Sequence, residues 1–159
     1  MTDSQIRLGR KEIKKLLPHR FWMLFISSAI YEEGSNEIIA YKRVSWWCDF
    51  PFLLGHFFAK IFYPGVCQYE CFNQAAALLV KLMNPDSVNG LPKVVGYEEI
   101  RHVSSITVGD LLEIHVRLDR ARSGVYFFSG NISKRDARGL LCAVEINKMK
   151  GVADAPKLK

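Results

Sequence analysis

Residues 64–83 read PGVCQYECFNQAAALLVKLM, and this stretch decides how the rest of the chain is organised. It opens on Pro64-Gly65, and Asn84-Pro85-Asp86 ends it. Its alanine-rich second half favours a helix, and no turn residues divide it into strand lengths. Polar residues interrupt the run, so a membrane span is not expected; they are Gln68, Glu70, Asn73, Gln74 and Lys81. The stretch therefore predicts one long buried helix.

The segments before this helix are expected to form a short helix and a hairpin. Ser4–Leu17 mixes apolar and charged residues in the way that an amphipathic helix does. Strand-like apolar residues follow at 23–31 and again at 38–46. The turn-forming residues 32–36 separate these two runs, which predicts a hairpin. The aromatic-rich stretch 47–63 is expected to be irregular.

The part of the chain after the helix is expected to consist of strands. Residues 111–120 alternate apolar with polar side chains, as a strand with one buried face does. Further strands are expected at 93–105, 125–133 and 140–148. One long helix against one antiparallel sheet is an α+β arrangement. We expect a single domain over residues 1–159, with its core spanning about residues 12–150, because the chain shows no linker and no repeat.

The composition narrows the classes of function. The chain is 49% hydrophobic and 12% aromatic, which excludes a disordered protein. The formal net charge of +6 favours an acidic partner, but no helix-turn-helix, zinc-finger or RNA-binding motif is present, so nucleic acid is not expected. The four cysteines form neither a CxxC pair nor a zinc-spaced cluster, so no metal site is expected. The polar N-terminus lacks a signal peptide, which predicts a cytoplasmic location.

His56 and Glu70 flank the start of the predicted helix and can form an acid/base pair. Glu70 would lie roughly 7–8 Å along the helix axis from Gly65. Gly65 lets a ligand approach the backbone closely. The unpaired N–H groups and the positive dipole end at a helix start can hold a carbonyl oxygen that gains negative charge. A histidine, a carboxylate and such donors around one pocket form an acid/base site.

Each of these residues also has a structural interpretation. A lone histidine in an aromatic loop is more often structural than catalytic. A glutamate within an apolar helix is costly to bury unpaired, and Glu70 can pair with Arg101 or Lys60 as a structural ion pair. The occurrence of His56 and Glu70 together, with Pro64-Gly65 between them, favours the functional interpretation.

Several motifs resemble those of the FabZ-type 3-hydroxyacyl-ACP dehydratases, which belong to the hot-dog superfamily. In chain order, Leu17-Pro18-His19-Arg20 resembles LPHR, Gly55-His56-Phe57 resembles GHF, Pro64-Gly65-Val66 with Glu70 and Asn73-Gln74-Ala75-Ala76 resembles PGV…E…AQAA, and Gly96, Arg101 and Val108-Gly109-Asp110 resemble G…R…PGD. The matches run in order from about residue 12 to residue 146. The spacing from GHF through PGV to the glutamate is the specific part of the resemblance.

The resemblance implies a hot-dog fold, with an antiparallel sheet around a long central helix, and a homodimer or dimer-based higher oligomer. Each active site would combine His56 of one subunit with Glu70 of the other. The implied reaction is the reversible syn elimination of water from a 3-hydroxyacyl thioester. His56 would remove the C2 proton, and Glu70, protonated or through a held water, would deliver a proton to the departing 3-hydroxyl. The Gly65 amide would polarise the thioester carbonyl, so no metal or organic cofactor is needed.

The resemblance also implies partners and further site residues. The substrate would arrive on the phosphopantetheine arm of an acidic acyl carrier protein, in fatty-acid or polyketide-type biosynthesis. Lys60 and Arg101 are expected on the rim where this carrier docks. The residues expected to bind the substrate or line the oxyanion site, beside Gly65, are Val66, Phe57, Tyr63 and Gln74.

The chain departs from the family pattern around the expected pocket. The family continues GHF with Pro-Gly-His-Pro, whereas this chain has Phe58-Ala59-Lys60-Ile61. Tyr63 stands where the family has Met, and His102 stands where it has Phe. These changes indicate a divergent member, with a specialised substrate. Two alternatives stay open: a hot-dog enoyl isomerase or acyl thioesterase, and a non-catalytic subunit that binds acyl chains or a carrier.

Overall fold

A computed structural model describes residues 4–54, 56, 61–85, 92–136 and 139–153. Along the chain the elements are β1 (Gln5–Leu8), α1 (Arg10–Leu16), the 3-10 turn η1 (Phe21–Met23), β2 (Ser28–Glu32), β3 (Glu37–Arg43), α2 (Trp46–Leu53), α3 (Gly65–Met83), β4 (Lys93–His102), β5 (Leu111–Arg122), β6 (Val125–Asp136) and β7 (Gly139–Val152). The long helix α3 thus separates two groups of strands, as the sequence predicts.

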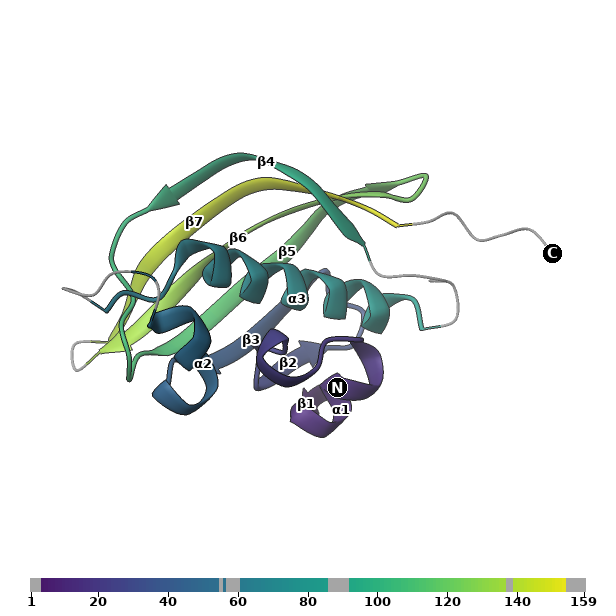
Figure 1. Ribbon diagram of the computed structural model, residues 1–159. Helices are drawn as coiled ribbons and strands as arrows, with labels where there is room; N and C mark the ends of the chain where they lie inside the picture. The colour runs from purple at the N-terminus through teal and green to yellow at the C-terminus, as the bar shows by residue number, and fades with distance from the viewer. Residues whose placement is uncertain (1–3, 55, 57–60, 86–91, 137–138, 154–159) are drawn as a thin grey trace.

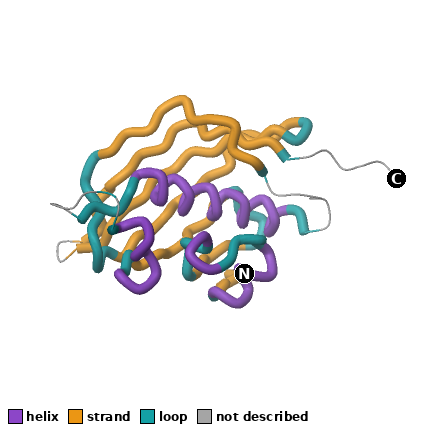
Figure 2. The backbone as a smooth tube through the Cα atoms, in the orientation of Figure 1, coloured by secondary structure: helices purple, strands orange, loops and turns teal. Residues whose placement is uncertain are grey.

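The strands of the described residues form one antiparallel sheet in the order β1-β2-β3-β5-β6-β7-β4. The sheet curves, and α3 lies along its concave side, while α1 and α2 lie on the side of α3 that faces away from β4 (Figures 1 and 2). The predicted α+β hot-dog arrangement, a central helix wrapped by an antiparallel sheet, is confirmed.

Side chains alternate between the two faces of each strand, and this alternation explains which face of the sheet packs against the helix. In β5, Leu112, Ile114 and Val116 are buried, whereas the residues between them point outward. The register places Ile114 opposite Ala40 of β3 and opposite Ile132 of β6, which are also buried. Buried side chains of neighbouring strands therefore line up into one apolar surface against α3.

Helix α3 is covered along most of its length. The carbonyl of Pro64, its N-cap residue, accepts hydrogen bonds from the N–H groups of Cys67 at 3.0 Å and Gln68 at 3.1 Å. At Gly130 on β6, an added Cβ would lie 2.0 Å from the carbonyl oxygen of His115 on β5 and 3.1 Å from the ring of Phe72 on α3, so only glycine fits there. No helix among the described residues is long and apolar enough to cross a membrane.

Three predictions of local structure are wrong. The segment predicted as one helix over 4–17 divides at Gly9 into β1 and α1, because β1 gains the ladder hydrogen bonds of β2. The first predicted strand begins only at Ser28, after the turn η1. The stretch 47–63, predicted to be irregular, contains most of α2, which is capped by the hydroxyl of Ser45.

A buried ion pair ties α2 to β3. Lys42 is 4% exposed and Asp49 is 1% exposed, and the Lys42 Nζ lies 2.9 Å from a carboxylate oxygen of Asp49. Asp49 also accepts a hydrogen bond of 2.9 Å from the backbone N–H of Ser45. Because α2 leads directly into the segment that carries His56, this pair positions the start of that segment.

Breaking the Lys42–Asp49 pair should destabilise the protein strongly. Asp49→Ala leaves the buried ammonium group without a counter-charge, which should lower the free energy of unfolding by about 3–5 kcal/mol. The control is Glu98→Ala, which removes the exposed partner of Lys148 and should leave stability essentially unchanged. Denaturant unfolding followed by circular dichroism measures both effects. An Asp49→Ala variant as stable as the wild type would contradict the role given to the pair.

Candidate active site

The N-terminus of α3 presents backbone donors beside a groove. The N–H groups of Gly65 and Val66 stand before the first residues that bond to the Pro64 carbonyl, so the helix gives them no acceptor. A groove of about 370 Å³ lies next to Gly65 and is bordered by residues 102–106, at the end of β4 and beyond. Val66 is exposed. A carbonyl oxygen in this groove would lie near the positive end of the helix dipole.

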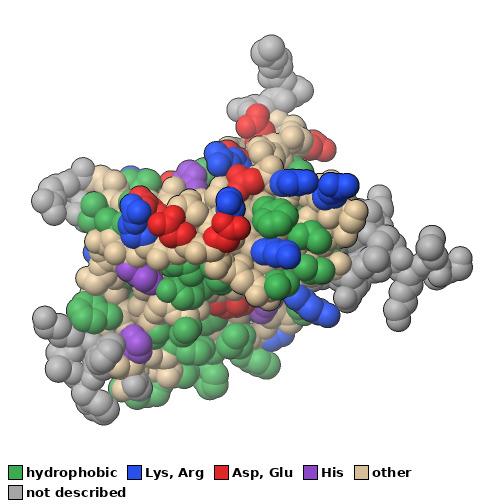
Figure 3. Space-filling view, turned by 90° about the horizontal axis from the view of Figure 1, so that it is seen from above, with side chains coloured by type: hydrophobic (Ala, Val, Ile, Leu, Met, Phe, Trp, Pro, Cys, Tyr) green, Lys and Arg blue, Asp and Glu red, His purple; other side chains and the backbone are tan. Residues whose placement is uncertain are grey.

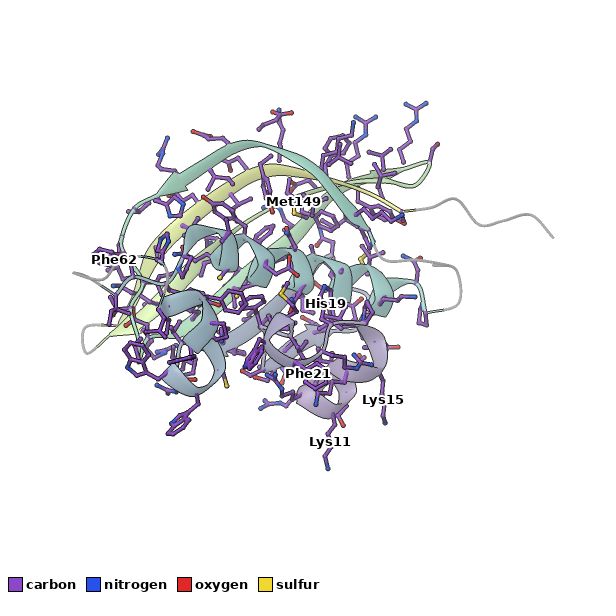
Figure 4. All side chains as sticks on the ribbon, viewed as in Figure 1. Lys11, Lys15, His19, Phe21, Phe62 and Met149 are labelled. Carbon is purple, nitrogen blue, oxygen red and sulfur yellow. The ribbon has the colours of Figure 1, made fainter. Side chains whose placement is uncertain are left out.

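Three side chains hold the carboxylate of Glu70, which lies further along α3. Gln74 Nε2 donates to Oε1 at 2.8 Å, and Asn73 Nδ2 donates to Oε2 at 3.4 Å. His19 Nε2 lies 3.3 Å from Oε1, and it reaches α3 from the segment that follows α1 (Figure 4). The Glu70 side chain is 24% exposed and lines a cavity of about 230 Å³. The carboxylate is therefore oriented but still accessible.

These contacts set the charge of Glu70. Burial alone would raise the pKa of its carboxyl group, but the hydrogen bonds from His19, Gln74 and Asn73, with the charge of His19, lower that pKa below its ordinary value. Glu70 is therefore a carboxylate at neutral pH. In this state it accepts hydrogen bonds and can hold a water, and it is a poor direct source of a proton.

Gln74 is fully buried and uses both ends of its amide group. Its Oε1 accepts a hydrogen bond of 3.0 Å from the N–H of Phe25, and its Nε2 donates to the carbonyl of Met23 at 2.7 Å as well as to Glu70. Gln74 thus joins the segment before β2 to α3 and also supports the carboxylate of Glu70. A direct contact between Gln74 and the substrate stays a prediction.

His56 follows the end of α2. Its side chain is exposed, and its backbone N–H lies 3.5 Å from the carbonyl oxygen of Leu53. Phe57 and Lys60, expected to contact substrate and carrier, lie outside the described residues. The pairing of His56 with Glu70 stays a prediction.

Tyr63 is buried at the entry to α3. Its hydroxyl lies 3.8 Å from Cys71 Sγ, and its carbonyl accepts a hydrogen bond of 2.7 Å from Gln68. Burial raises the pKa of the Tyr63 phenol, so the group stays protonated. Tyr63 also borders the groove beside Gly65, which places it near the expected oxyanion site.

Arg101 lies among acidic neighbours on β4. Its guanidinium group lies 3.4 Å from Glu99 and 3.4 Å from Glu145, so the alternative in which Arg101 pairs with Glu70 is wrong. Acidic and basic side chains lie side by side on this outer face (Figure 3).

No three His, Cys, Asp or Glu side chains of the described residues are arranged to hold a metal ion.

His19 and Asn73 belong to the site although neither was predicted as a site residue. Asn73 and Gln74 stand three and four positions after Glu70, a helical spacing that places side chains next to each other, so the sequence did contain this signal. His19 is distant in the sequence, and only the fold brings it to Glu70. The hydroxyl of Tyr97 on β4 donates to Asn73 and extends the network to the sheet.

Removing the contact from His19 should raise the pKa of Glu70. In His19→Phe, burial continues to disfavour the carboxylate while one hydrogen bond and one charge are lost. A pH titration of the Glu70 carboxyl carbon by NMR measures this change. The control is His115→Phe, which removes the partner of Glu113 on the outer face of the sheet and should leave the titration of Glu70 unchanged. An unshifted Glu70 in His19→Phe would refute the assigned cause.

Comparison with solved structures identifies the fold. The dehydratase heterocomplex ApeI:P from Xenorhabdus doucetiae superimposes with a TM-score of 0.69 at 20% identity, over 91% of both chains. A hypothetical thioesterase with coenzyme A from Streptococcus pneumoniae TIGR4 gives a TM-score of 0.56 at 12% identity, over 76% of this chain and 81% of that one. At these identities the likeness shows a shared fold.

Comparison with known sequences identifies the family, although no protein-family model matches the chain. The chain is 35% identical to the 3-hydroxyacyl-[acyl-carrier-protein] dehydratase FabZ of Dichelobacter nodosus. This alignment extends over 147 residues and covers 87% of this chain and 94% of that protein. It is 36% identical over 138 residues to the FabZ of Acidovorax sp. strain JS42, covering 85% and 92%. The chain therefore belongs to the FabZ family of 3-hydroxyacyl-[acyl-carrier-protein] dehydratases.

Proposed function

We propose that the protein removes water reversibly from a 3-hydroxyacyl thioester on an acyl carrier protein, in fatty-acid or polyketide-type biosynthesis. The observation that carries this proposal is the state of Glu70, an oriented and accessible carboxylate on the helix that starts at Gly65. FabZ relatives that match most of the chain are named for this reaction.

In the proposed reaction, the thioester carbonyl lies at the N-terminus of α3. The Gly65 N–H and the helix dipole stabilise the negative charge that the carbonyl oxygen gains as the C2–H bond breaks. His56 takes the C2 proton, the C2=C3 double bond forms and the C3–O bond breaks. The hydroxyl leaves as water after it gains a proton, and the proton on His56 returns to solvent, so that protons balance over one cycle.

The lowered pKa of Glu70 supports one of the two routes for the proton that reaches the leaving hydroxyl. A carboxylate holds a water by accepting its hydrogen bond, and that water relays a proton from solvent to the hydroxyl. Direct transfer from a protonated Glu70 would first require the carboxylate to gain a proton against its hydrogen-bonded surroundings. We therefore propose the water relay as the role of Glu70.

The carbonyl group of the acyl thioester itself accepts the electrons left at C2, so the proposed chemistry needs no metal or organic cofactor.

The net charge of +6 suits an acidic carrier protein. Lys60 and Arg101 are proposed at the rim where this carrier docks. The bound phosphopantetheine arm would then enter the groove beside Gly65.

A homodimer with shared active sites completes the proposal, with His56 of one subunit facing Glu70 of the other. Strand β4 supports it, because β4 is an edge strand that pairs only with β7 among the described residues. Its Val94 and Val95 are 37% and 62% exposed. An edge strand with exposed valines is suited to pairing with a second copy of the chain.

Complementation between inactive variants tests the shared site. His56→Ala and Glu70→Gln should each reduce dehydration by at least about 100-fold, because each removes one half of the acid/base pair. When the two chains are coexpressed, random pairing yields about half mixed dimers, each with one intact site, so about a quarter of wild-type activity should return. Absorbance of the conjugated enoyl thioester follows the reaction.

The control is a chain that carries both substitutions, coexpressed with the Glu70→Gln chain. No mixed dimer then has an intact site, so no activity should return. Absence of recovery in the first mixture as well would refute sites shared between subunits.

A further inference from the structure

A tyrosine–histidine pair flanks the N-terminus of α3. The hydroxyl of Tyr69 lies 2.6 Å from His102 Nε2, and the two ring centres are 5.6 Å apart. Tyr69 stands four residues after Gly65, and side chains of a helix lean toward its N-terminus, so Tyr69 lies over Gly65. His102 is the last residue of β4. The pair therefore bridges the helix start and the edge strand.

The pair lies against the backbone of Gly65. A Cβ built on Gly65 would lie 3.4 Å from the Tyr69 hydroxyl and 3.4 Å from His102 Cε1, so the absence of a side chain leaves the hydroxyl facing the helix start. Gly65 and His102 line the same groove of about 370 Å³. Gln68 lines it too, and its Nε2 donates a hydrogen bond of 2.7 Å to the carbonyl of Tyr63, another residue of the groove.

We infer that Tyr69 is a second hydrogen-bond donor to the thioester carbonyl, beside the Gly65 N–H, and that His102 positions it. This inference rests on the proposed function, in which the thioester carbonyl binds at the Gly65 N–H. With its hydrogen on Nε2, His102 donates to the Tyr69 oxygen and leaves the phenol O–H free to donate to a carbonyl oxygen bound beside Gly65. A donor there stabilises the negative charge on the carbonyl oxygen when C2 loses its proton.

Two polar side chains next to the pair, Tyr97 and Arg101, have partners of their own. The ring of Tyr97 packs against Tyr69 with centres 5.8 Å apart, but the Tyr97 hydroxyl is bound to Asn73 and so belongs to the network of Glu70. Burial raises the pKa of Tyr97 to about 12, which keeps that phenol protonated as a donor to Asn73. Arg101, next to His102, is paired with acidic residues.

Substitutions separate a donor from a packing residue. Tyr69→Phe keeps the ring and removes the hydroxyl, so kcat should fall about 10- to 100-fold while KM changes less than about threefold. His102→Phe should also lower kcat, and His102→Gln, which keeps an N–H donor, should retain most of it. The double variant Tyr69→Phe/His102→Phe should be no slower than Tyr69→Phe, because the two residues act as one unit. Tyr126→Phe on β6 is the control and should be unaffected.

Infrared spectroscopy distinguishes failure of this inference from failure of the proposed function. The carbonyl band of a bound, 13C-labelled enoyl thioester should move to lower wavenumber in the wild type and move less in Tyr69→Phe. A smaller shift in Tyr69→Phe supports the inference even if the wild type proves to have no dehydratase activity. Equal band positions in the two proteins, or a kcat unchanged by Tyr69→Phe, would overturn it.

Discussion

The amide of Gln74 is the contact on which the site depends, because this fully buried polar group is hydrogen-bonded through both its oxygen and its nitrogen. It binds the backbone of Met23 and Phe25 on one side and the carboxylate of Glu70 on the other. One side chain thus fixes the N-terminal segment to α3 and orients the acidic group that the helix carries. His19, which precedes Met23 in the same segment, also contacts Glu70. Fold and site are coupled here, since loosening the segment would also release the carboxylate.

Rigid elements supply most of the site. Glu70 and Gly65 lie on α3, which runs along the concave side of the curved sheet (Figure 1). Because both residues belong to one helix, helix geometry sets their separation. His56 instead follows α2, which the buried pair of Lys42 and Asp49 anchors to β3. In the proposed reaction, the helix therefore holds the carbonyl site at Gly65 and the carboxylate of Glu70 at a fixed separation. In the proposed reaction, the surroundings of Glu70 favour a proton relay through a bound water over direct transfer from a protonated carboxyl group.

The sequence predicted the parts of the structure that depend on local patterns. Residues 64–83 combine a proline-glycine start with a long, mostly apolar run that no turn residue divides, and the helix begins and ends within one residue of that stretch. Strand β5 is predicted from residues 111–120 because their alternation shows which face of the strand is buried. Residues 47–63 do not reveal α2 because its cap residue, Ser45, and its ion-pair partner, Lys42, both precede that stretch. The contact between His19 and Glu70 was missed for a related reason, since no local pattern records a contact across the fold.

The central claim is that this chain eliminates water from a 3-hydroxyacyl thioester, and identifying the product tests it most directly. Proton NMR of the purified protein with a carrier-bound 3-hydroxybutyryl thioester should show the 2-enoyl thioester, and the same mixture should form when the reaction starts from the enoyl side. The thioester bond should remain intact throughout. Release of free thiol with 3-hydroxybutyrate, a double bond shifted away from the carbonyl, or no reaction from either side would contradict the account.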